Sequence, residues 1–507
     1  MAETGKRIII VGAGPGGLTA GMILARRGFD VTIYEKETEV GGRNGELRLA
    51  DYRFDIGPTF LMMKFLLDEM FAETGRDSAD YLDFVRLDPM YELKFVDRAI
   101  FPTDDFDKMR DEIARAFPGE EAGLELFFKR EKERFAKMYG CLQAAYSSPL
   151  DYLKPVFLKA IPHLSVGRSL YGVLGDYFDH EYLRLAFTFQ SKYLGMSPWS
   201  CPGAFAMIPY IEYAYGIYHV TGGLSEISRA MAKVLEEEGG TICLGAPVEK
   251  LLTRGRLVDG VVLANGAIDR ADSVIVNADF AHAMTRIIEP GLLEKYTQEN
   301  LAARDYSCST FMLYLGLDKT YDMTHHTIIF AEDYERNIAD ISINKCLSDQ
   351  LSFYVRNASV TDSTQAPEGH SAIYVLVPVA NNQSGIDWSQ EAGPFRERVL
   401  DAIAQRTALT DIRDHIVVEK MITPEDWEEE RSVYFGATFN LSHKLTQMLY
   451  LRPHNQFEEL ANCYLVGGGT HPGSGLPTIY ESGRITANLL AERFGADFKK
   501  PSGVPLS

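Results

Sequence analysis

The chain has 507 residues, of which 46% are hydrophobic, so it can bury a large core and is longer than one domain usually runs. Its formal net charge at pH 7 is −20, and an acidic surface of this kind argues against nucleic acid as a partner. It contains no signal peptide and no run of about 18 apolar residues, so we expect a cytoplasmic protein without a membrane span.

The first predicted elements are a strand at residues 8–11, a glycine-rich turn and a helix that ends near residue 27. The turn consists of Gly12, Ala13, Gly14, Pro15, Gly16 and Gly17. Such a turn lets the chain bend tightly and lets backbone approach a pyrophosphate at the N-terminus of the helix. A second strand at 31–35 ends in Glu35, and Lys36 follows it. A carboxylate at the position of Glu35 can accept hydrogen bonds from the hydroxyl groups of an adenosine ribose. The spacing predicts dinucleotide binding, with an ordinary strand-to-helix turn as the alternative.

A second glycine turn follows at Gly41, Gly42 and Arg43. A Gly-Gly turn exposes backbone N–H groups, and Arg43 adds a fixed positive charge beside a pyrophosphate. The alternative interpretation of these residues is a plain surface turn.

The segment 153–178 interleaves apolar residues with Lys154, Lys159, His163 and Arg168, and Pro162 breaks it into two short predicted helices. A basic amphipathic stretch can lie in a membrane interface. An equally good interpretation is a pair of helices that closes a substrate domain.

The segment 206–218 carries four tyrosines, which form either core or the wall of an apolar channel. A helix at 227–238 and strands at 239–244, 246–252 and 273–279 then continue the dinucleotide-binding fold. Farther on, strands at 309–316 and 371–378 and a helix at 394–407 predict an antiparallel sheet. We expect no metal site, because the adjacent His325 and His326 point in different directions.

Near the C-terminus a short strand at 464–467 leads into a turn that contains Gly468, Gly469 and His471, and a helix runs from about residue 477 to 494. The N-terminus of that helix can stabilise negative charge on a bound group. His471 is the best ionisable candidate in this segment, although its His-Pro-Gly sequence could equally form a turn that shapes a cofactor pocket.

Four segments of this chain together (8–59, 183–223, 246–279 and 462–490) resemble the phytoene desaturase family, the bacterial and fungal flavoenzymes that dehydrogenate long polyenes. The family belongs to a larger group of FAD-dependent, amine-oxidase-like proteins. The most restrictive part of the resemblance is Thr-His-Pro-Gly-Ser-Gly at 470–475. The flavin-binding motifs alone are shared with amine oxidases.

The resemblance implies that FAD is the cofactor and that both ends of the chain hold it. Beyond the two N-terminal glycine turns, it implies contacts from Pro58, Thr59, Val248, Gly468, Gly469, Leu476, Pro477 and Thr478. It implies a substrate cleft near Gln190, Tyr193, Tyr213, Tyr215 and Tyr480. Tyr480 stands where many well-known desaturases have small or aliphatic residues, which leaves the exact substrate open.

We expect an α/β fold with a discontinuous, Rossmann-like FAD domain at 1–95, 215–288 and 455–495. An α+β substrate domain at 96–214 and 289–454 would contain the antiparallel sheet and a helical, membrane-facing part at 150–214. Residues 496–507 would form a tail.

The reaction implied by the resemblance is dehydrogenation of a hydrophobic isoprenoid polyene, such as phytoene or a C30 analogue, by hydride transfer to the flavin. A quinone or O₂ would reoxidise the flavin, and the protein would sit peripherally on the cytoplasmic membrane. The same scaffold also supports carotenoid isomerases, saturases and oxidases, flavin amine oxidases, and escort proteins that bind isoprenoid groups without flavin.

Overall fold

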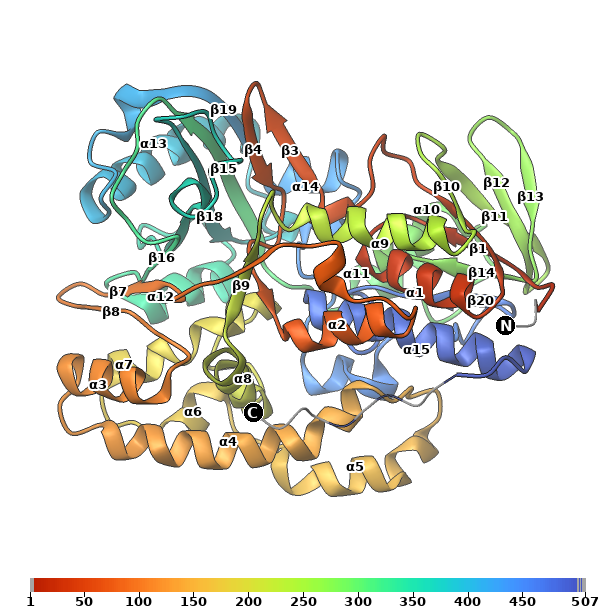
Figure 1. The fold of residues 1–507 in the computed structure, drawn as a ribbon, viewed down its shortest axis with the longest axis horizontal. Coiled ribbons are helices and arrows are strands. Elements are labelled where there is room, and N and C mark those ends of the chain that lie inside the picture. The colour runs from red at the N-terminus through yellow and green to blue at the C-terminus, as the bar shows by residue number, and fades with distance from the viewer. Residues whose placement is uncertain (1–3, 499–500, 502, 504–507) are drawn as a thin grey trace.

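The computed structural model describes residues 4–498, 501 and 503, so most of the predicted tail lies outside the described residues. This part of the chain is a mixed α/β structure with one parallel sheet, one large and mainly antiparallel sheet, and a layer of helices below both (Figure 1). The predicted α/β fold class is confirmed, and the membrane-facing role of the helical part stays a prediction.

The parallel sheet lies on the right in Figure 1 and has five strands. In spatial order they are β10 (Thr241–Cys243), β2 (Asp30–Tyr34), β1 (Arg7–Val11), β14 (Ser273–Val276) and β20 (Cys463–Leu465). Side chains of β1 alternate between two hydrophobic cores, with Ile8 and Ile10 in one and Ile9 and Val11 in the other. The predicted β-branched strand is therefore buried on both faces, as a parallel sheet requires.

Helices cover one face of the parallel sheet, and a small antiparallel sheet with two helices covers the other. The first face carries α1 (Pro15–Arg26), α2 (Lys64–Ala72), α9 (Ser225–Glu237) and α15 (Leu476–Phe494). The second carries β11 (Val248–Arg254), β12 (Leu257–Leu263), β13 (Ile268–Arg270), α10 (Phe280–Arg286) and α11 (Gln298–Ala302). The first and last helices of the fold, α1 and α15, pack directly against each other.

The larger sheet lies on the upper left in Figure 1. Its order is β19 (Ile416–Ile422), β15 (Ser309–Leu317), β18 (Ser371–Val379), β17 (Phe353–Asn357), β16 (His326–Ile329), β7 (Glu92–Lys94) and β8 (Ala99–Ile100). All neighbours are antiparallel except β16 and β7. The helix α13 (Trp388–Arg406) packs on one face, and the hairpin of β3 (Glu46–Leu49) and β4 (Tyr52–Asp55) packs on the other.

Two details differ from the expected boundaries. The predicted helix at 394–407 begins at Trp388, because the Asp387 side chain accepts a hydrogen bond from the Ser389 N–H and Trp388 packs on Phe395. The strand β7 falls inside the predicted FAD segment 1–95, yet it pairs with β16 in the larger sheet. The division into domains stays a prediction.

Helices of different lengths form the bottom layer in Figure 1. They are α3 (Phe106–Ala116), α4 (Glu121–Leu142), α5 (Pro155–Ala160), α6 (Leu170–Leu174), α7 (Glu181–Ala186) and α8 (Met207–Tyr215). The strand β9 (Ile217–Val220) follows α8 and pairs with β5 (Leu61–Met62) and β6 (Phe84–Arg86). The remaining helices, α12 (Tyr334–Ala339) and α14 (Pro424–Glu429), belong to the segments around the larger sheet.

Candidate active site

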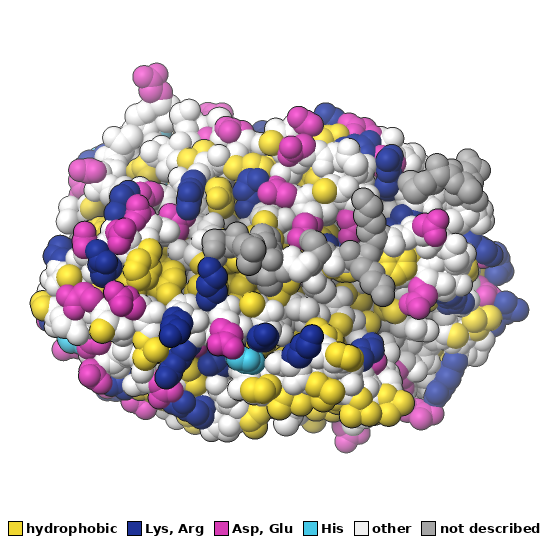
Figure 2. All heavy atoms as spheres, turned by 60° about the horizontal axis from the view of Figure 1, so that its bottom comes forward, with side chains coloured by type: hydrophobic (Ala, Val, Ile, Leu, Met, Phe, Trp, Pro, Cys, Tyr) yellow, Lys and Arg dark blue, Asp and Glu magenta, His cyan; other side chains and the backbone are white. Residues whose placement is uncertain are grey.

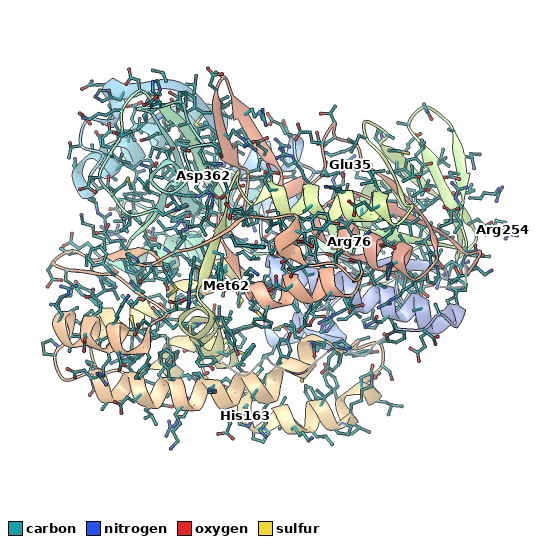
Figure 3. All side chains as sticks on the ribbon, in the orientation of Figure 1. Glu35, Met62, Arg76, His163, Arg254 and Asp362 are labelled. Atoms are coloured by element: carbon teal, nitrogen blue, oxygen red, sulfur yellow. The ribbon has the colours of Figure 1, made fainter. Side chains whose placement is uncertain are left out.

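One continuous cavity of about 540 Å³ runs from the N-terminal glycine turn to the larger sheet. Glu35 and Met62 both line it, although they lie in different parts of the molecule in Figure 3. The predicted cofactor residue Glu35 therefore shares one cavity with an apolar side chain from another part of the fold.

The first glycine turn forms a cradle locked by Asn277. Gly12 has φ +100°, and a Cβ there would lie 2.6 Å from the Asn277 carbonyl oxygen, so only glycine fits. The Asn277 side-chain amide donates to the carbonyl oxygens of Gly12 (2.9 Å) and Gly14 (3.2 Å). This leaves the N-terminus of α1 open towards the cavity, where an anion would bind.

Glu35 lies at the end of β2, as predicted, and lines the cavity. One of its carboxylate oxygens accepts from the Ala13 N–H (2.6 Å) and the other from the Glu37 N–H (2.9 Å). The carboxylate is thus fixed in place with lone pairs left for a ligand.

Arg43 lines the cavity within a polar cluster. It donates to the Thr438 carbonyl oxygen (3.1 Å) and lies 3.8 Å from Asp279. With its amide turned to suit both neighbours, Asn440 accepts from Arg43 (2.9 Å) and donates to Asp279 (2.7 Å). Burial raises the pKa of Asp279, and the Arg43 charge opposes that rise.

The C-terminal turn forms the neighbouring wall. Leu476, the first residue of α15, is buried and lines the cavity together with Gly468 and Pro477. A Cβ added at Gly483 in α15 would lie 2.8 Å from the Gly16 carbonyl oxygen. This close approach holds the C-terminal turn against the N-terminal cradle.

Most of the predicted cofactor residues line this cavity. They are Gly12, Gly14, Pro15, Gly16, Glu35, Lys36, Gly42, Arg43, Pro58, Thr59, Val248, Gly468, Leu476 and Pro477. The others (Ala13, Gly17, Gly41, Gly469 and Thr478) belong to the same segments but do not line the cavity. A Cβ at Gly469 would lie 2.5 Å from that of Phe280.

Sequence reasoning missed several polar residues at the same end, notably Asn277, Asp279, His282 and Arg431, which all line the cavity. The first three follow β14, the strand predicted to return towards the cofactor, so their position was a usable signal. Arg431 lies in a loop without a motif. Its Nε is buried and has no hydrogen-bond partner among the described residues, so it is a donor free for a ligand.

The other end of the cavity is an apolar chamber. Its walls come from the larger sheet, the segment after Thr59 and the 3₁₀ turn η5 (Phe189–Leu194). Lining side chains include Phe60, Met62, Phe189, Tyr193, Met312, Ile328, Phe353, Tyr374, Leu376 and Trp427. A chamber of this composition suits a long hydrocarbon.

Among the predicted substrate residues, only Tyr193 lines the cavity. Gln190 and Tyr213 instead lie with it around Glu212, a fully buried carboxyl group that sequence reasoning missed. Glu212 accepts from the Gln190 amide (2.7 Å) and the Tyr91 hydroxyl (3.1 Å). Burial raises the pKa of Glu212 to about 7, against the lowering effect of Gln190, Tyr193 and Tyr91.

Tyr215 and Tyr480 lie away from the cavity lining. Tyr215 packs on Phe65, with 5.1 Å between ring centroids. Tyr480 is fully buried in the helical core around α15, and its hydroxyl has no hydrogen-bond partner among the described residues.

His471 is also buried outside the cavity lining. Its Nε2 donates to the Ala144 carbonyl oxygen (2.9 Å), and its ring packs on Tyr146 at 5.1 Å. Burial lowers its pKa to about 3. A neutral imidazole held in this way fits the second of the two sequence interpretations, a turn that shapes the cofactor pocket.

One polar pair does reach the chamber. The Tyr354 hydroxyl lies 2.8 Å from the Thr59 hydroxyl and 2.6 Å from His326 Nδ1, and both Thr59 and Tyr354 line the cavity. Among the described residues, no group of three or more His, Cys, Asp or Glu side chains is arranged to hold a metal ion.

The residues at the polar end fit a dinucleotide such as FAD. The open helix N-terminus and the cationic Arg43 and Arg431 suit the pyrophosphate, and the fixed Glu35 carboxylate suits a ribose. The unpaired Arg431 Nε is the clearest sign, because a buried donor of this kind is costly without a partner.

Comparison with known proteins agrees with this geometry. Residues 15–491 match the family described as flavin containing amine oxidoreductase. The chain is 56% identical to a 4,4'-diapophytoene desaturase (4,4'-diapolycopene-forming) of a Methylomonas species, over 98% of both chains. It is 37% identical to an all-trans-zeta-carotene desaturase of Myxococcus xanthus, over 98% of this chain and 96% of that one.

Solved structures show the same fold at low sequence identity. A putrescine oxidase variant superposes with a TM-score of 0.62 at 15% identity, over 97% of this chain and 99% of the other. An oxidoreductase from Methanosarcina mazei gives 0.60 at 16% identity, over 96% and 100%. The chain therefore belongs to the flavin-containing amine oxidoreductase family and, within it, to the carotenoid desaturases, as the resemblance predicted.

Proposed function

We propose that this protein is an FAD-dependent desaturase that introduces C=C bonds into an isoprenoid hydrocarbon, a C30 polyene of the 4,4'-diapophytoene type. The observation that carries the proposal is one continuous cavity, polar at the dinucleotide end and apolar at the other. The 56% identical relative supports the C30 chain length.

We propose that the two ends of the chain hold the cofactor together. The cradle at Gly12–Gly17, with Arg43 and Arg431, would bind the pyrophosphate, and Glu35 would bind the adenosine ribose. Pro58, Thr59, Gly468, Leu476 and Pro477 would surround the ring system. When bound, FAD supplies the acceptor for the hydride that leaves the substrate carbon.

The protein's own contribution is to place the hydrocarbon and exclude water. Tyr193 packs against Phe60, with 5.6 Å between the ring centroids. Phe60 directly follows Pro58 and Thr59 in the chain, the two residues predicted to contact the flavin ring. Such aromatic walls leave little lateral freedom to a polyene, and correct placement of a reacting C–H bond is a large part of catalysis.

The direct test is expression in a host that makes 4,4'-diapophytoene, with pigment analysis of the products. We expect coloured, more unsaturated C30 products from the flavin-loaded protein. Recovery of the unchanged precursor, with the protein folded and yellow, would contradict desaturation. Products altered only in double-bond geometry would favour an isomerase, and oxygenated products would favour a carotenoid oxidase.

We further propose peripheral attachment to a membrane through the strip 150–166. Its exposed apolar side chains are Leu150 (71% exposed), Leu153 (67%), Leu158 (48%), Ile161 (46%) and Val166 (70%). Figure 2 shows hydrophobic side chains gathered among basic ones on the bottom face of the molecule, and Figure 3 places His163 there. Among the described residues, no helix has the length and apolar character needed to cross a bilayer.

Co-sedimentation with liposomes tests the strip. Leu153→Asp with Leu158→Asp should release the protein from the vesicles while FAD stays bound. Phe157 is a poorer choice, because it packs on Tyr152 at 4.8 Å. The matched control changes two exposed apolar residues elsewhere, Leu244→Asp with Ile268→Asp, and should sediment like the unchanged protein.

The electron acceptor is proposed as a membrane quinone or O₂. Anaerobic assays with and without a quinone separate the two. Turnover without O₂ that depends on added quinone would assign the quinone, and turnover that needs only O₂ would assign O₂.

A further inference from the structure

The chamber contains a lysine without a carboxylate partner. Lys192 lies in η5 and lines the cavity. Its ammonium group donates to the Ser352 hydroxyl (2.6 Å) and lies over the rings of Tyr334 (5.0 Å) and Phe330 (5.5 Å). No acidic side chain pairs with it in the part of the chain that the structure describes.

A hydrocarbon gives such a group nothing to bind. An ammonium group has three donors, and Ser352 takes one of them. The two rings stabilise the positive charge but accept no strong hydrogen bond. Burial lowers the pKa of Lys192 to about 7, and the neighbouring Cys308, which also lines the cavity, opposes that shift.

Lys192 contacts a segment that both lines the cavity and reaches the protein surface. The Lys192 ammonium group lies over the ring of Tyr334, which is the first residue of α12. The helix α12 continues into the π-helical turn η7 (Asp340–Asn344). Ile338, Ile341 and Ser342 of this segment line the cavity, and Ser342 is exposed to solvent. One end of a long ligand would therefore lie near this amine.

We propose that Lys192 binds a carbonyl oxygen at one end of the ligand, so that the chamber takes isoprenoid chains with a terminal aldehyde as well as hydrocarbons. This inference rests on the proposed function, since it concerns the ligand of the same cavity. A carbonyl oxygen accepts a hydrogen bond from the amine in either protonation state, whereas the rest of the chain packs on apolar walls.

The inference is tested by measuring ligand binding to the flavin-loaded enzyme. Binding is monitored through the change that it causes in the flavin absorption spectrum. The probes are squalene and its analogue with one terminal methyl group oxidised to an aldehyde. The unchanged enzyme should bind the aldehyde at least about tenfold more tightly, the factor expected for a hydrogen bond to a charged group. In Lys192→Met, a side chain of similar length without the amine, the two probes should bind alike, and Lys192→Arg should restore a preference.

Equal binding of the two probes by the unchanged enzyme, or a preference that survives in Lys192→Met, would overturn the inference. Failure of both probes to bind would instead count against the proposed function. The two failures are therefore distinguishable.

Chemical trapping gives a second readout that does not depend on affinity. Near pH 7 an amine of lowered pKa condenses with an aldehyde to an imine, with loss of water, and cyanoborohydride reduces the imine to a stable secondary amine. Ordinary lysines, with a pKa near 10.4, stay mostly protonated and react slowly. We expect peptide mass spectrometry to find the label at Lys192, and a label only at surface lysines would contradict the assignment.

Discussion

The two ends of the cavity are built in different ways. At the polar end, turns that follow strands β1, β2, β14 and β20 present backbone groups and a few fixed charges. At the apolar end, side chains from the larger sheet and from η5 form the walls. The polar end depends on backbone conformation that glycines make accessible, and the chamber depends on which way side chains point.

Leu476 lines the cavity at the proposed flavin-ring position, and changing it should give the largest effect. Leu476→Trp would fill space beside the predicted ring position, so turnover of a C30 polyene should fall by about 100-fold or more, while FAD stays bound. Product formation per bound flavin measures this. Tyr480→Phe is the control, since Tyr480 lies off the cavity, and its turnover should change little. Normal turnover in Leu476→Trp would show that the substrate approaches elsewhere.

Gly14→Val tests the polar end alone. Gly14 has an ordinary φ of −76°, and its nearest neighbour would be the Asn277 amide at 3.2 Å, so the chain should still fold. The added side chain would occupy the space of the pyrophosphate and cost about 1–3 kcal/mol of binding free energy. Flavin content after gel filtration measures the loss. Gly393→Val, in open space on α13, should keep its flavin, and full retention by Gly14→Val would refute the cradle.

Arg43→Ala should weaken FAD binding by about 1.5 kcal/mol, through loss of a charge-assisted contact. It should also change the pH dependence of stability, because Asp279 loses its cation. The pKa of Asp279 is already raised by burial, so folding takes up a proton and stability falls as pH rises above the ordinary carboxyl range. Without Arg43 this fall should be steeper. Melting temperatures between pH 4 and 8 would show it, and Asp279→Asn in the same variant should remove it.

Glu212→Gln tests the wall behind the chamber, and its effect on stability should depend on pH. The pKa of Glu212 is about 7 in the folded protein, above its unfolded value. Its contribution is therefore favourable at low pH and lost as pH rises through 7, by at most about 1.4 kcal/mol per pH unit. Denaturant unfolding should show Glu212→Gln gaining stability relative to the unchanged protein from pH 5 to 7. A constant difference across that range would mean that Glu212 does not titrate there.

Sequence reasoning succeeded where local backbone geometry decides the outcome. Gly12 and Glu35 lie in a strand–turn–helix unit whose spacing predicts dinucleotide binding, and both line the cavity as expected. Arg43 was placed by the same logic. The boundaries of β1, α9 and α15 were also predictable, because hydrophobic periodicity and flanking glycines determine them.

Side-chain direction in the chamber was not predictable in this way. The density of tyrosines at 206–218 gives no sign of which ones face inward, and Tyr213 turned out to pack on Phe187 beside Glu212. Trp427 and Tyr374 line the chamber from segments without any motif. Their position depends on pairing between strands far apart in the sequence, which no local pattern encodes.

The contact between Gly16 and Gly483 has a consequence for biosynthesis. The proposed cofactor pocket is lined by the turn at 467–477 as well as by the N-terminal cradle, so a ribosome must make both segments before this cavity wall is complete. The nascent protein consequently exposes its dinucleotide motif for most of its synthesis without a complete site. We therefore expect cofactor loading to be a late event, and prematurely terminated chains to be colourless.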